Sequence, residues 1–278
     1  MQAPEVRRPA VAGRFYPSDP EVLAREIEEY VHAESGESVG EGKFANALGC
    51  LVPHAGYMYS GHVAGAVYRR LPARSSYIIL APNHFGRGAP LALMSEGAWL
   101  TPLGLAPIDH ALAHSLAHAC HLLVEDAQAH ASEHSLEVQL PFLQHLVKEF
   151  SFVPVLIGLG GYAALESLGR GVAQAVKQAE KPALIIASSD MNHYEPDDVT
   201  RIKDRKAIDP ILALDPHALY EVIRREDISM CGYGPAVAML TAAKELGATR
   251  AELVKYATSA DTSGDRTTAV GYAGIVVS

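Results

Sequence analysis

The segment "ALGCLVPHAG", residues 47–56, joins a short apolar run to a histidine and then a glycine. Continuous apolar runs of this length are typical of strands buried on both faces of a parallel sheet. The same arrangement recurs in "SYIILAPNHFG" (76–86) and "ALIIASSDMNHY" (183–194). A histidine follows each of the three runs: His54, His84 and His193. Together the segments predict a parallel sheet whose strands deliver histidines at their carboxyl ends.

The rest of the chain continues this alternation of apolar runs and helical patterns. Further strand-like runs occupy residues 152–158, 251–258 and 269–277. Apolar residues recur at helical spacing in six segments: 61–71, 109–122, 135–149, 163–179, 199–213 and 234–246. Short apolar strands that alternate with helices predict an α/β fold. We expect a single domain over residues 1–278, with a mostly parallel sheet and helices on both faces.

Three local patterns refine this outline. Ser18 and Glu21 have the spacing of a capping box, which predicts a helix that runs to about Val31. The segment "LALMSEGAWLTPLG" (91–104) is expected to form an antiparallel hairpin beside the sheet. Residues 33–44 are rich in glycine, serine and glutamate, which is typical of a surface loop.

Composition limits the class of protein. The chain has 278 residues, is 49% hydrophobic and carries a net charge of −9. No apolar run approaches the ~18 residues of a membrane span, and residues 1–20 lack the apolar core of a secretory signal. Three scattered cysteines do not suggest a disulfide framework, and no block of Lys or Arg favours nucleic acid as a partner. We therefore expect a soluble, cytoplasmic protein that binds neither membranes nor nucleic acids.

The three strand-end histidines indicate where function lies. In open α/β sheets, ligands bind in the crevice outside the carboxyl ends of the strands. One histidine at such a position is often only a buried side chain satisfied by a backbone carbonyl. Three strands that end in the same way instead predict that His54, His84 and His193 share a pocket.

A second group of histidines has helical spacing in "DHALAHSLAHACH". Its members lie four or three residues apart: His110, His114, His118 and His121. Leu112, Leu116 and Leu123 occupy the opposite face with the same period, so the histidines are expected to face solvent. Adventitious metal binding is the alternative, because histidines four residues apart on a helix can chelate an ion.

His134 stands in "SEHSLEVQLPFL" with Glu137 and Gln139, at the start of an expected helix. These polar residues cluster near one helix end rather than along a stripe. A position in the pocket and a position on the surface both remain open for His134.

Cys231 lies in "CGYGP" (231–235), a glycine-rich turn that opens a helix. Two glycines allow the backbone to approach another group closely. A helix N-terminus lowers the pKa of a thiol and favours the thiolate, which binds metals. Two histidines and a thiolate suit iron, copper or zinc, whereas a buried inert cysteine is the alternative.

Six motifs in order carry a family resemblance: "RPAVAGRFYP", "PHAGYMYSG", "APNHFG", "EHSLEVQLPFL", "SSDMNHY" and "CGYGP". Spanning residues 8–235, they resemble the Memo family (mediator of cell motility). Its prokaryotic members are described as protein B of the AmmeMemoRadiSam system, together with an AMMECR-like protein and a radical-SAM protein. The family is similar in fold to the class III extradiol ring-cleaving dioxygenases, whose iron is held by two histidines and a glutamate.

The resemblance implies roles for individual residues. Its metal ligands fall on His54, His84 and Cys231, so that a thiolate stands where the dioxygenases use a carboxylate. His193, with Asp190 beside it, falls where the dioxygenases keep their catalytic histidine. Tyr59 matches a tyrosine implicated in phosphotyrosine-peptide binding by an animal member.

Two hypotheses follow from the residues and the resemblance. In the first, the protein is a dioxygenase-like enzyme that holds Fe(II), or copper or zinc, and acts on a phenolic or related small molecule. His193 would then be the general acid/base, oriented by Asp190 three residues earlier. Substrate contacts are expected from five side chains: Tyr57, Tyr59, Asn83, His134 and Tyr233. In the second hypothesis, the same pocket binds a metal, a peptide or a partner protein without turnover.

Overall fold

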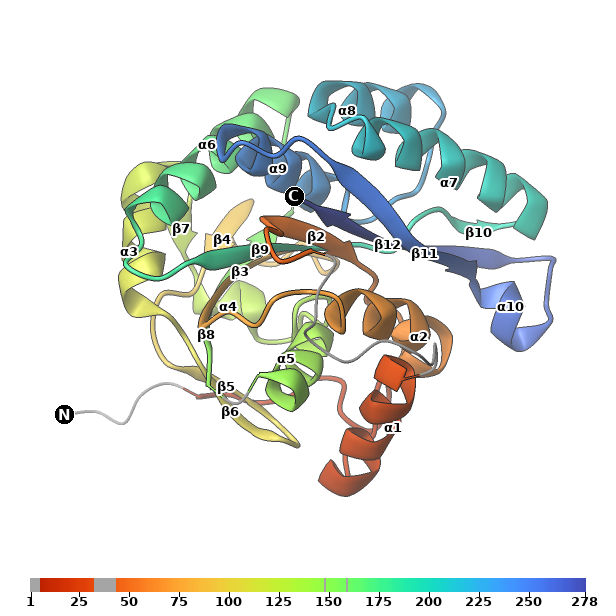
Figure 1. The fold of residues 1–278 in the computed structure, drawn as a ribbon, viewed down its shortest axis with the longest axis horizontal. Coiled ribbons are helices and arrows are strands. Elements are labelled where there is room, and N and C mark those ends of the chain that lie inside the picture. Colours follow the sequence, from red (N-terminus) through yellow and green to blue (C-terminus); the bar gives the residue numbers. More distant parts are fainter. Residues whose placement is uncertain (1–5, 33–43, 148, 159) are drawn as a thin grey trace.

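The structure is a computed structural model that describes residues 6–32, 44–147, 149–158 and 160–278 (Figure 1). Its centre is a nine-stranded sheet with the strand order β10-β12-β2-β9-β3-β8-β4-β7, and β11 pairs with β12 beside this path. No helix in the described ranges is both long and apolar enough to cross a membrane.

Four parallel strands form the middle of this sheet. They are the apolar runs of the sequence, and nearly all of their residues are buried: β2 (Gly49–Val52), β9 (Ala183–Ser188), β3 (Ser76–Pro82) and β8 (Ser151–Ile157). In register, Ile78 of β3 lies opposite Ile185 of β9 and Val153 of β8. Because both faces are covered, continuous apolar runs are the expected sequence for these strands.

Antiparallel strands flank this parallel centre, so the complete sheet is mixed. On one side, β12 (Ala269–Val277) pairs antiparallel with β2, β11 (Ala251–Thr258) and β10 (His193–Glu195). On the other, β4 (Leu91–Leu93) is antiparallel to β8 and parallel to β7 (Val124–Glu125). The predicted α/β class is confirmed, and the mostly parallel character holds for the central strands.

The prediction of an antiparallel hairpin at 91–104 was wrong about the residues of its first strand. Residues Leu91–Leu93 belong to the main sheet as β4 and are fully buried there. The antiparallel hairpin is β5 (Ala98–Thr101) with β6 (Gly104–Pro107), and β1 (Val6–Arg7) pairs with β5 to complete a small second sheet. Gly97 has a φ of 95° between β4 and β5, a conformation that suits glycine and redirects the chain away from the main sheet.

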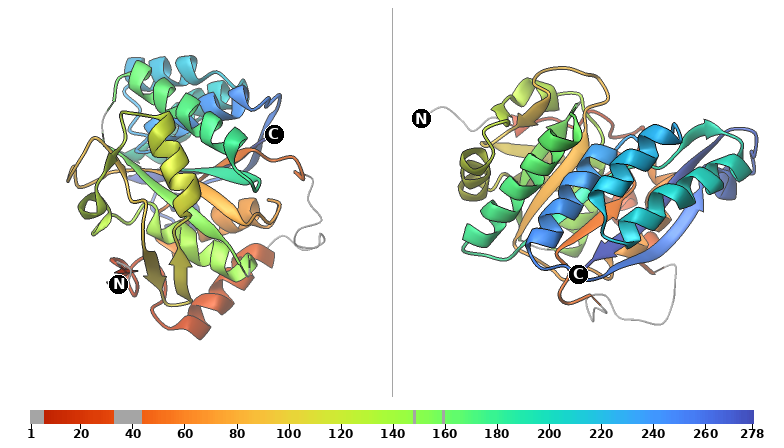
Figure 2. Two further views of the ribbon diagram at one scale, coloured as in Figure 1. Left: turned by 90° about the vertical axis from the view of Figure 1, so that its left-hand side faces the viewer. Right: turned by 90° about the horizontal axis from the view of Figure 1, so that it is seen from above.

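Helices cover both faces of the main sheet, as predicted (Figure 1). One face carries α3 (His110–Ala119), α6 (Tyr162–Gln178) and α9 (Tyr233–Glu245), whose apolar residues pack with Ile78 and Leu80 of β3. The right-hand view of Figure 2 shows the green α6 and the blue α9 lying over the sheet.

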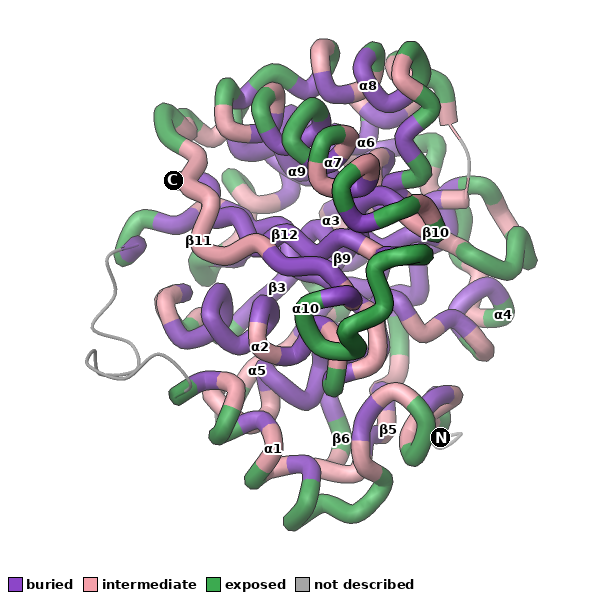
Figure 3. Tube along the Cα trace, turned by 90° about the vertical axis from the view of Figure 1, so that its right-hand side faces the viewer, coloured by how far each residue is buried: buried purple, intermediate pink, exposed green. Residues whose placement is uncertain are grey.

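The opposite face carries α1 (Pro20–His32), α2 (Tyr57–Tyr68) and α5 (Leu140–Leu146). Their apolar residues pack with Tyr77 and Ile79, the alternate positions of β3. The remaining helical segments are α4 (Ala127–His130), the 3₁₀ turn Glu137–Gln139, α7 (Asp197–Leu212), α8 (Pro216–Arg225) and α10 (Ser259–Ser263). Figure 3 shows β12 and β9 of the main sheet as largely buried, whereas β11 at its edge is mostly intermediate.

Several helix boundaries differ from prediction. Asp19, rather than Ser18, caps α1, because its Oδ1 accepts hydrogen bonds from the backbone N–H groups of Glu21 and Val22 at 3.0 and 2.9 Å. The helix expected at 135–149 is only a 3₁₀ turn followed by α5, and α8 was not predicted. The loop expected at 33–44 lies outside the described residues except for Phe44.

Candidate metal-binding pocket

A pocket of about 560 Å³ opens at the carboxyl ends of β2, β3 and β9. Six polar side chains of its wall come from segments far apart in sequence: His54, His84, His134, Asp190, His193 and Cys231. The prediction that the three strand-end histidines share a pocket is therefore confirmed in position. His134 also lines this pocket rather than the outer surface.

His54 is fixed by a hydrogen-bond network behind the pocket. It is 2% exposed, and its Nδ1 lies 3.0 Å from Oγ of Ser188. That hydroxyl donates its proton to the carbonyl of Ser135 at 2.6 Å and accepts from the Gln139 amide at 2.8 Å. Because the hydroxyl has no second proton, Nδ1 of His54 must be the donor to Ser188. The lone pair of Nε2 then points into the pocket, where Sγ of Cys231 lies 3.2 Å away.

His84 is oriented by Glu133, a buried carboxylate that the sequence analysis did not single out. Nδ1 of His84 donates to Oε1 of Glu133 at 3.0 Å, and the backbone N–H of His84 donates to Oε2 at 2.6 Å. The backbone N–H groups of His134 and Ser135 donate to Oε1 at 2.8 and 2.9 Å. Although burial acts to raise it, these contacts lower the pKa of Glu133 to about 2. Nε2 of His84 is left with a free lone pair.

Cys231 approaches the pocket because Gly232 follows it. A Cβ at Gly232 would lie 2.3 Å from the carbonyl oxygen of Ser188, so only glycine fits there. The sulfur lies 3.7 Å from the carbonyl oxygen of Asp190. Burial, with Asp190 adding to it, raises the pKa of the Cys231 thiol, so the expected lowering by the helix N-terminus was wrong. A metal ion that binds the sulfur would have to displace this proton.

The donor set fits a transition-metal ion. One nitrogen of His54, one of His84 and the sulfur of Cys231 all lie within 4.8 Å of one another. Each imidazole donates its other N–H to a fixed acceptor, the arrangement that orients metal-binding histidines. Two imidazoles and a thiolate suit iron, copper or zinc.

A second trio in the same pocket fits a metal less well. Donor atoms of His84, Glu133 and His134 also lie within 4.8 Å of one another. However, both oxygens of Glu133 already accept N–H groups, and its role is to hold His84 in place. Glu133 is therefore better suited to orienting a ligand than to being one.

The expected pairing of Asp190 with His193 was wrong. Nδ1 of His193 donates to the carbonyl of Ser229 at 2.9 Å, and its backbone N–H donates to the Ser229 hydroxyl at 2.8 Å. Oδ1 of Asp190 instead accepts the backbone N–H groups of His54 and Ala55 at 2.7 and 3.2 Å. Burial raises the pKa of Asp190. Asp190 thus shapes the loop that presents His54, while Ser229 leaves Nε2 of His193 free to exchange a proton.

His134 closes one side of the pocket as a stacked ring. Its centroid lies 4.7 Å from that of His84 and 4.7 Å from that of Phe15, which also lines the pocket. Burial lowers the pKa of His134, which favours the neutral imidazole. An aromatic ligand would meet these rings on entering.

Two of the other expected substrate contacts point away from the pocket. Tyr57 is buried in the core, and its hydroxyl donates to the carbonyl of Val138 at 2.7 Å. Tyr233 packs toward Tyr220, with ring centroids 6.2 Å apart. Neither residue belongs to the pocket wall: Tyr57 is buried in the core, and Tyr233 is partly buried and packs against it.

Asn83 and Tyr59 also lie outside the pocket wall. The Asn83 amide donates to the carbonyl of Arg87 at 2.7 Å and so closes the turn after His84. Tyr59 packs with Tyr272, a residue that does line the pocket.

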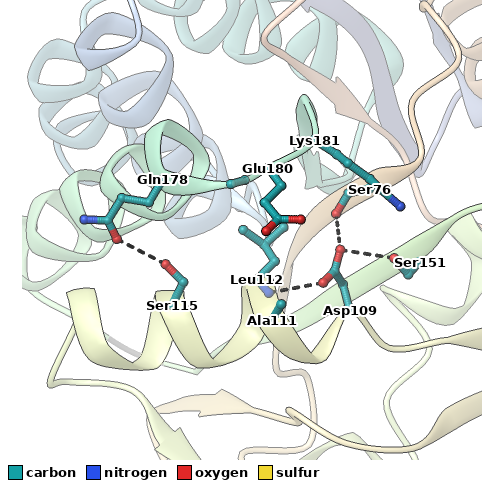
Figure 4. Close-up of a pocket in the computed structure, with 10 residues that line it drawn as sticks. Ser76, Asp109, Ala111, Leu112, Ser115, Ser151, Gln178, Glu180 and Lys181 are labelled. Atoms are coloured by element: carbon teal, nitrogen blue, oxygen red, sulfur yellow. Dashed lines mark hydrogen bonds between the residues drawn. The ribbon is translucent and has the colours of Figure 1, made fainter.

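A second hollow, of about 400 Å³, lies at the opposite edge of the sheet (Figure 4). Two carboxylates, Asp109 and Glu180, line it, and Asp109 already accepts hydrogen bonds from the hydroxyls of Ser76 and Ser151 at 2.6 and 3.1 Å. It also caps α3 by accepting from the backbone N–H of Leu112 at 3.1 Å. These contacts give Asp109 a structural role at the start of α3.

The fold and the pocket define an α/β protein with a histidine and cysteine site at the carboxyl edge of its sheet. A family model described as "Memo-like protein" matches residues 7–276. A MEMO1 family protein of Methanopyrus kandleri is 44% identical over 278 residues, covering 97% of this chain and 98% of that protein. A MEMO1 family protein of Pyrobaculum aerophilum is 45% identical over 276 residues, with 98% of both chains covered. The chain belongs to the Memo family, as the six motifs predicted.

Proposed function

We propose that this protein is a metal-dependent redox enzyme of the Memo family that acts on a phenolic or related small molecule. The observation that carries the proposal is the convergence of two pre-oriented imidazoles and a thiol within 4.8 Å in a pocket of about 560 Å³. His54, His84 and Cys231 would hold the ion. Fe(II) is the metal we favour, and copper or zinc suits the same donors.

A bound iron ion would supply Lewis acidity and one-electron chemistry at the floor of the pocket. The protein's own groups would prepare the substrate. Nε2 of His193 is the base that accepts the proton of a phenol, because the other ring nitrogen, Nδ1, donates its hydrogen bond to the carbonyl of Ser229. Phe15 and His134 would hold the aromatic ring by stacking.

The thiol distinguishes this site from a ligand set of two histidines and a carboxylate. A thiolate donates more charge to a metal than a carboxylate does, and it is itself open to oxidation. Oxygen chemistry here would therefore depend on the protection of Cys231 by the metal.

A non-catalytic role is the second candidate, and one observation favours it. Tyr194 is 77% exposed at the pocket, and Phe85, next to His84, is 53% exposed. Exposed aromatic side chains beside a pocket are suited to binding a peptide or a partner protein. The AMMECR-like and radical-SAM proteins implied by the family are partners we would test in this case, in a cytoplasmic setting.

The deciding experiment is metal analysis of anaerobically purified protein, followed by oxygen uptake with a panel of catechols. We expect one equivalent of iron at the pocket, its loss in His54→Ala/His84→Ala, and oxygen uptake with at least one catechol. A His118→Ala/His121→Ala variant, altered on the surface, is the matched control. Iron that is retained without any oxygen uptake would favour the binding module, and metal unaffected by the pocket double variant would refute the site.

A further inference from the structure

A separate group of metal donors lies on the outer surface, at the start of α3. His110 and His114 occupy the first two turns of this helix, and Glu96 comes from the bend between β4 and β5. One nitrogen of each histidine and a carboxylate oxygen of Glu96 lie within 4.8 Å of one another, and all three residues are exposed. The exposure of the histidine stripe was predicted, but the approach of Glu96 was not.

The backbone on both sides of this group is fixed. Gly97 turns the bend with a φ of 95°, and its carbonyl accepts the backbone N–H of Ile108 at 3.1 Å. Asp109 then caps α3, and its own backbone N–H donates to the carbonyl of Phe152 at 2.9 Å. The bend that carries Glu96 and the helix end that carries the histidines are therefore held next to each other before any ligand arrives.

The three side chains are also free to bind. Within the described part of the chain, no hydrogen bond or ion pair engages the carboxylate of Glu96 or the rings of His110 and His114. Glu133 in the pocket differs, since its oxygens accept several N–H groups. Ligand atoms around a tetrahedral zinc ion lie roughly 3.4 Å apart, so small side-chain rotations would complete the set.

We propose that Glu96, His110 and His114 form a second metal site, which binds a divalent transition ion such as Zn²⁺ independently of the pocket. Two histidines four residues apart on a helix present both rings to one ion, and two histidines with a glutamate form a known zinc donor set. Three protein ligands leave a coordination position open to solvent. The ion would tie the β4–β5 bend to α3.

The test is a Zn²⁺ titration against a chromogenic chelator, with wild-type protein and with His54→Ala/His84→Ala. We expect two equivalents for the wild type and one for the pocket variant. Glu96→Gln and His110→Ala should each weaken the remaining equivalent by at least about tenfold, the effect of roughly 1.4 kcal/mol. These residues are exposed, so the variants should fold, and circular dichroism would verify this.

His118→Ala/His121→Ala is the control, because it removes two histidines of the same stripe that do not face Glu96. It should leave the second equivalent unchanged. The proposal is overturned if wild-type protein binds only the pocket equivalent. It is also overturned if the second equivalent survives Glu96→Gln at full affinity, or is lost in the His118→Ala/His121→Ala control.

Discussion

Glu133→Gln is the substitution that most directly tests how the pocket is built. The Glu133 carboxylate accepts both N–H groups of His84 and the backbone N–H groups of His134 and Ser135. An amide has the same shape but one fewer acceptor oxygen, so its NH₂ group must face at least one of these donors. We expect the loop to loosen and the ring of His84 to lose its fixed orientation.

The structure gives the size of the effect on stability. Its contacts lower the pKa of Glu133 from 4.5 to about 2. Such a shift is worth about 3 kcal/mol in favour of the ionised carboxylate in the folded state. Glu133→Gln should therefore lower the free energy of unfolding at pH 7 by up to about 3 kcal/mol. Loss of a carboxylate that orients a metal-binding histidine should also weaken metal affinity by about 10- to 100-fold.

The assay is urea unfolding combined with a competitive iron or zinc titration. Glu137→Gln is the matched control. Glu137 is as buried as Glu133, and its carboxylate accepts hydrogen bonds from Arg7, Tyr16 and two backbone N–H groups. None of these hydrogen bonds comes from His84. Glu137→Gln should lose stability while keeping metal affinity. The reasoning is refuted if Glu133→Gln binds metal as tightly as the wild type, or if both variants lose affinity equally.

Three further predictions concern individual ionisable groups. Iodoacetamide should label Cys231 before Cys50 and Cys120, which are buried, and metal should protect Cys231; equal labelling without protection would contradict the ligand role. His193→Ala should keep its metal and lose turnover by ~10²–10⁴-fold, while metal loss in this variant would make His193 a ligand. Burial raises the pKa of Asp204 from 3.8 to about 7, so the folded state binds this proton more tightly than the unfolded chain. The free energy of unfolding should then fall by up to about 4 kcal/mol as the pH rises from about 4 to 7. In Asp204→Asn, the free energy of unfolding measured by urea titration should depend less on pH over this range.

The sequence could predict the central strands and the pocket histidines for the same physical reason. Strands buried on both faces need continuous apolar residues, and such runs are visible without any partner strand. The polar residue that ends each run, such as His54 after β2, then marks the carboxyl edge of the sheet. The antiparallel flanks could not be predicted in this way. Their pairing depends on register with distant strands, as between Ile275 and Leu51.

The groups that orient the histidines were missed because their partners are distant in sequence. Glu133 and His84 are 49 residues apart, and Ser229 and His193 are 36 apart. Glu133 opens the motif "EHSLEVQLPFL", but the motif does not show which group its carboxylate contacts, and no motif includes Ser229. The one orienting contact that was predicted, from Asp190 to His193, relied on closeness in sequence and was wrong. His193 begins β10 instead of continuing a helical turn from Asp190, and Ser229 holds its Nδ1 and its backbone N–H.

These orienting contacts also give a reason for a cysteine, rather than a carboxylate, as the third donor of the proposed metal site. Both carboxylates around the pocket are committed to the protein's own N–H groups, Glu133 to His84 and its neighbours and Asp190 to the loop of His54 and Ala55. A carboxylate used in this way stabilises the loops but has less capacity to balance the charge of a metal ion. Among the described residues whose donor atoms converge with His54 and His84, Cys231 is the one that can become an anion on binding. In the proposed metal site, the thiol would therefore supply the negative charge that a third carboxylate would otherwise provide, and Cys231→Asp should retain more metal than Cys231→Ala.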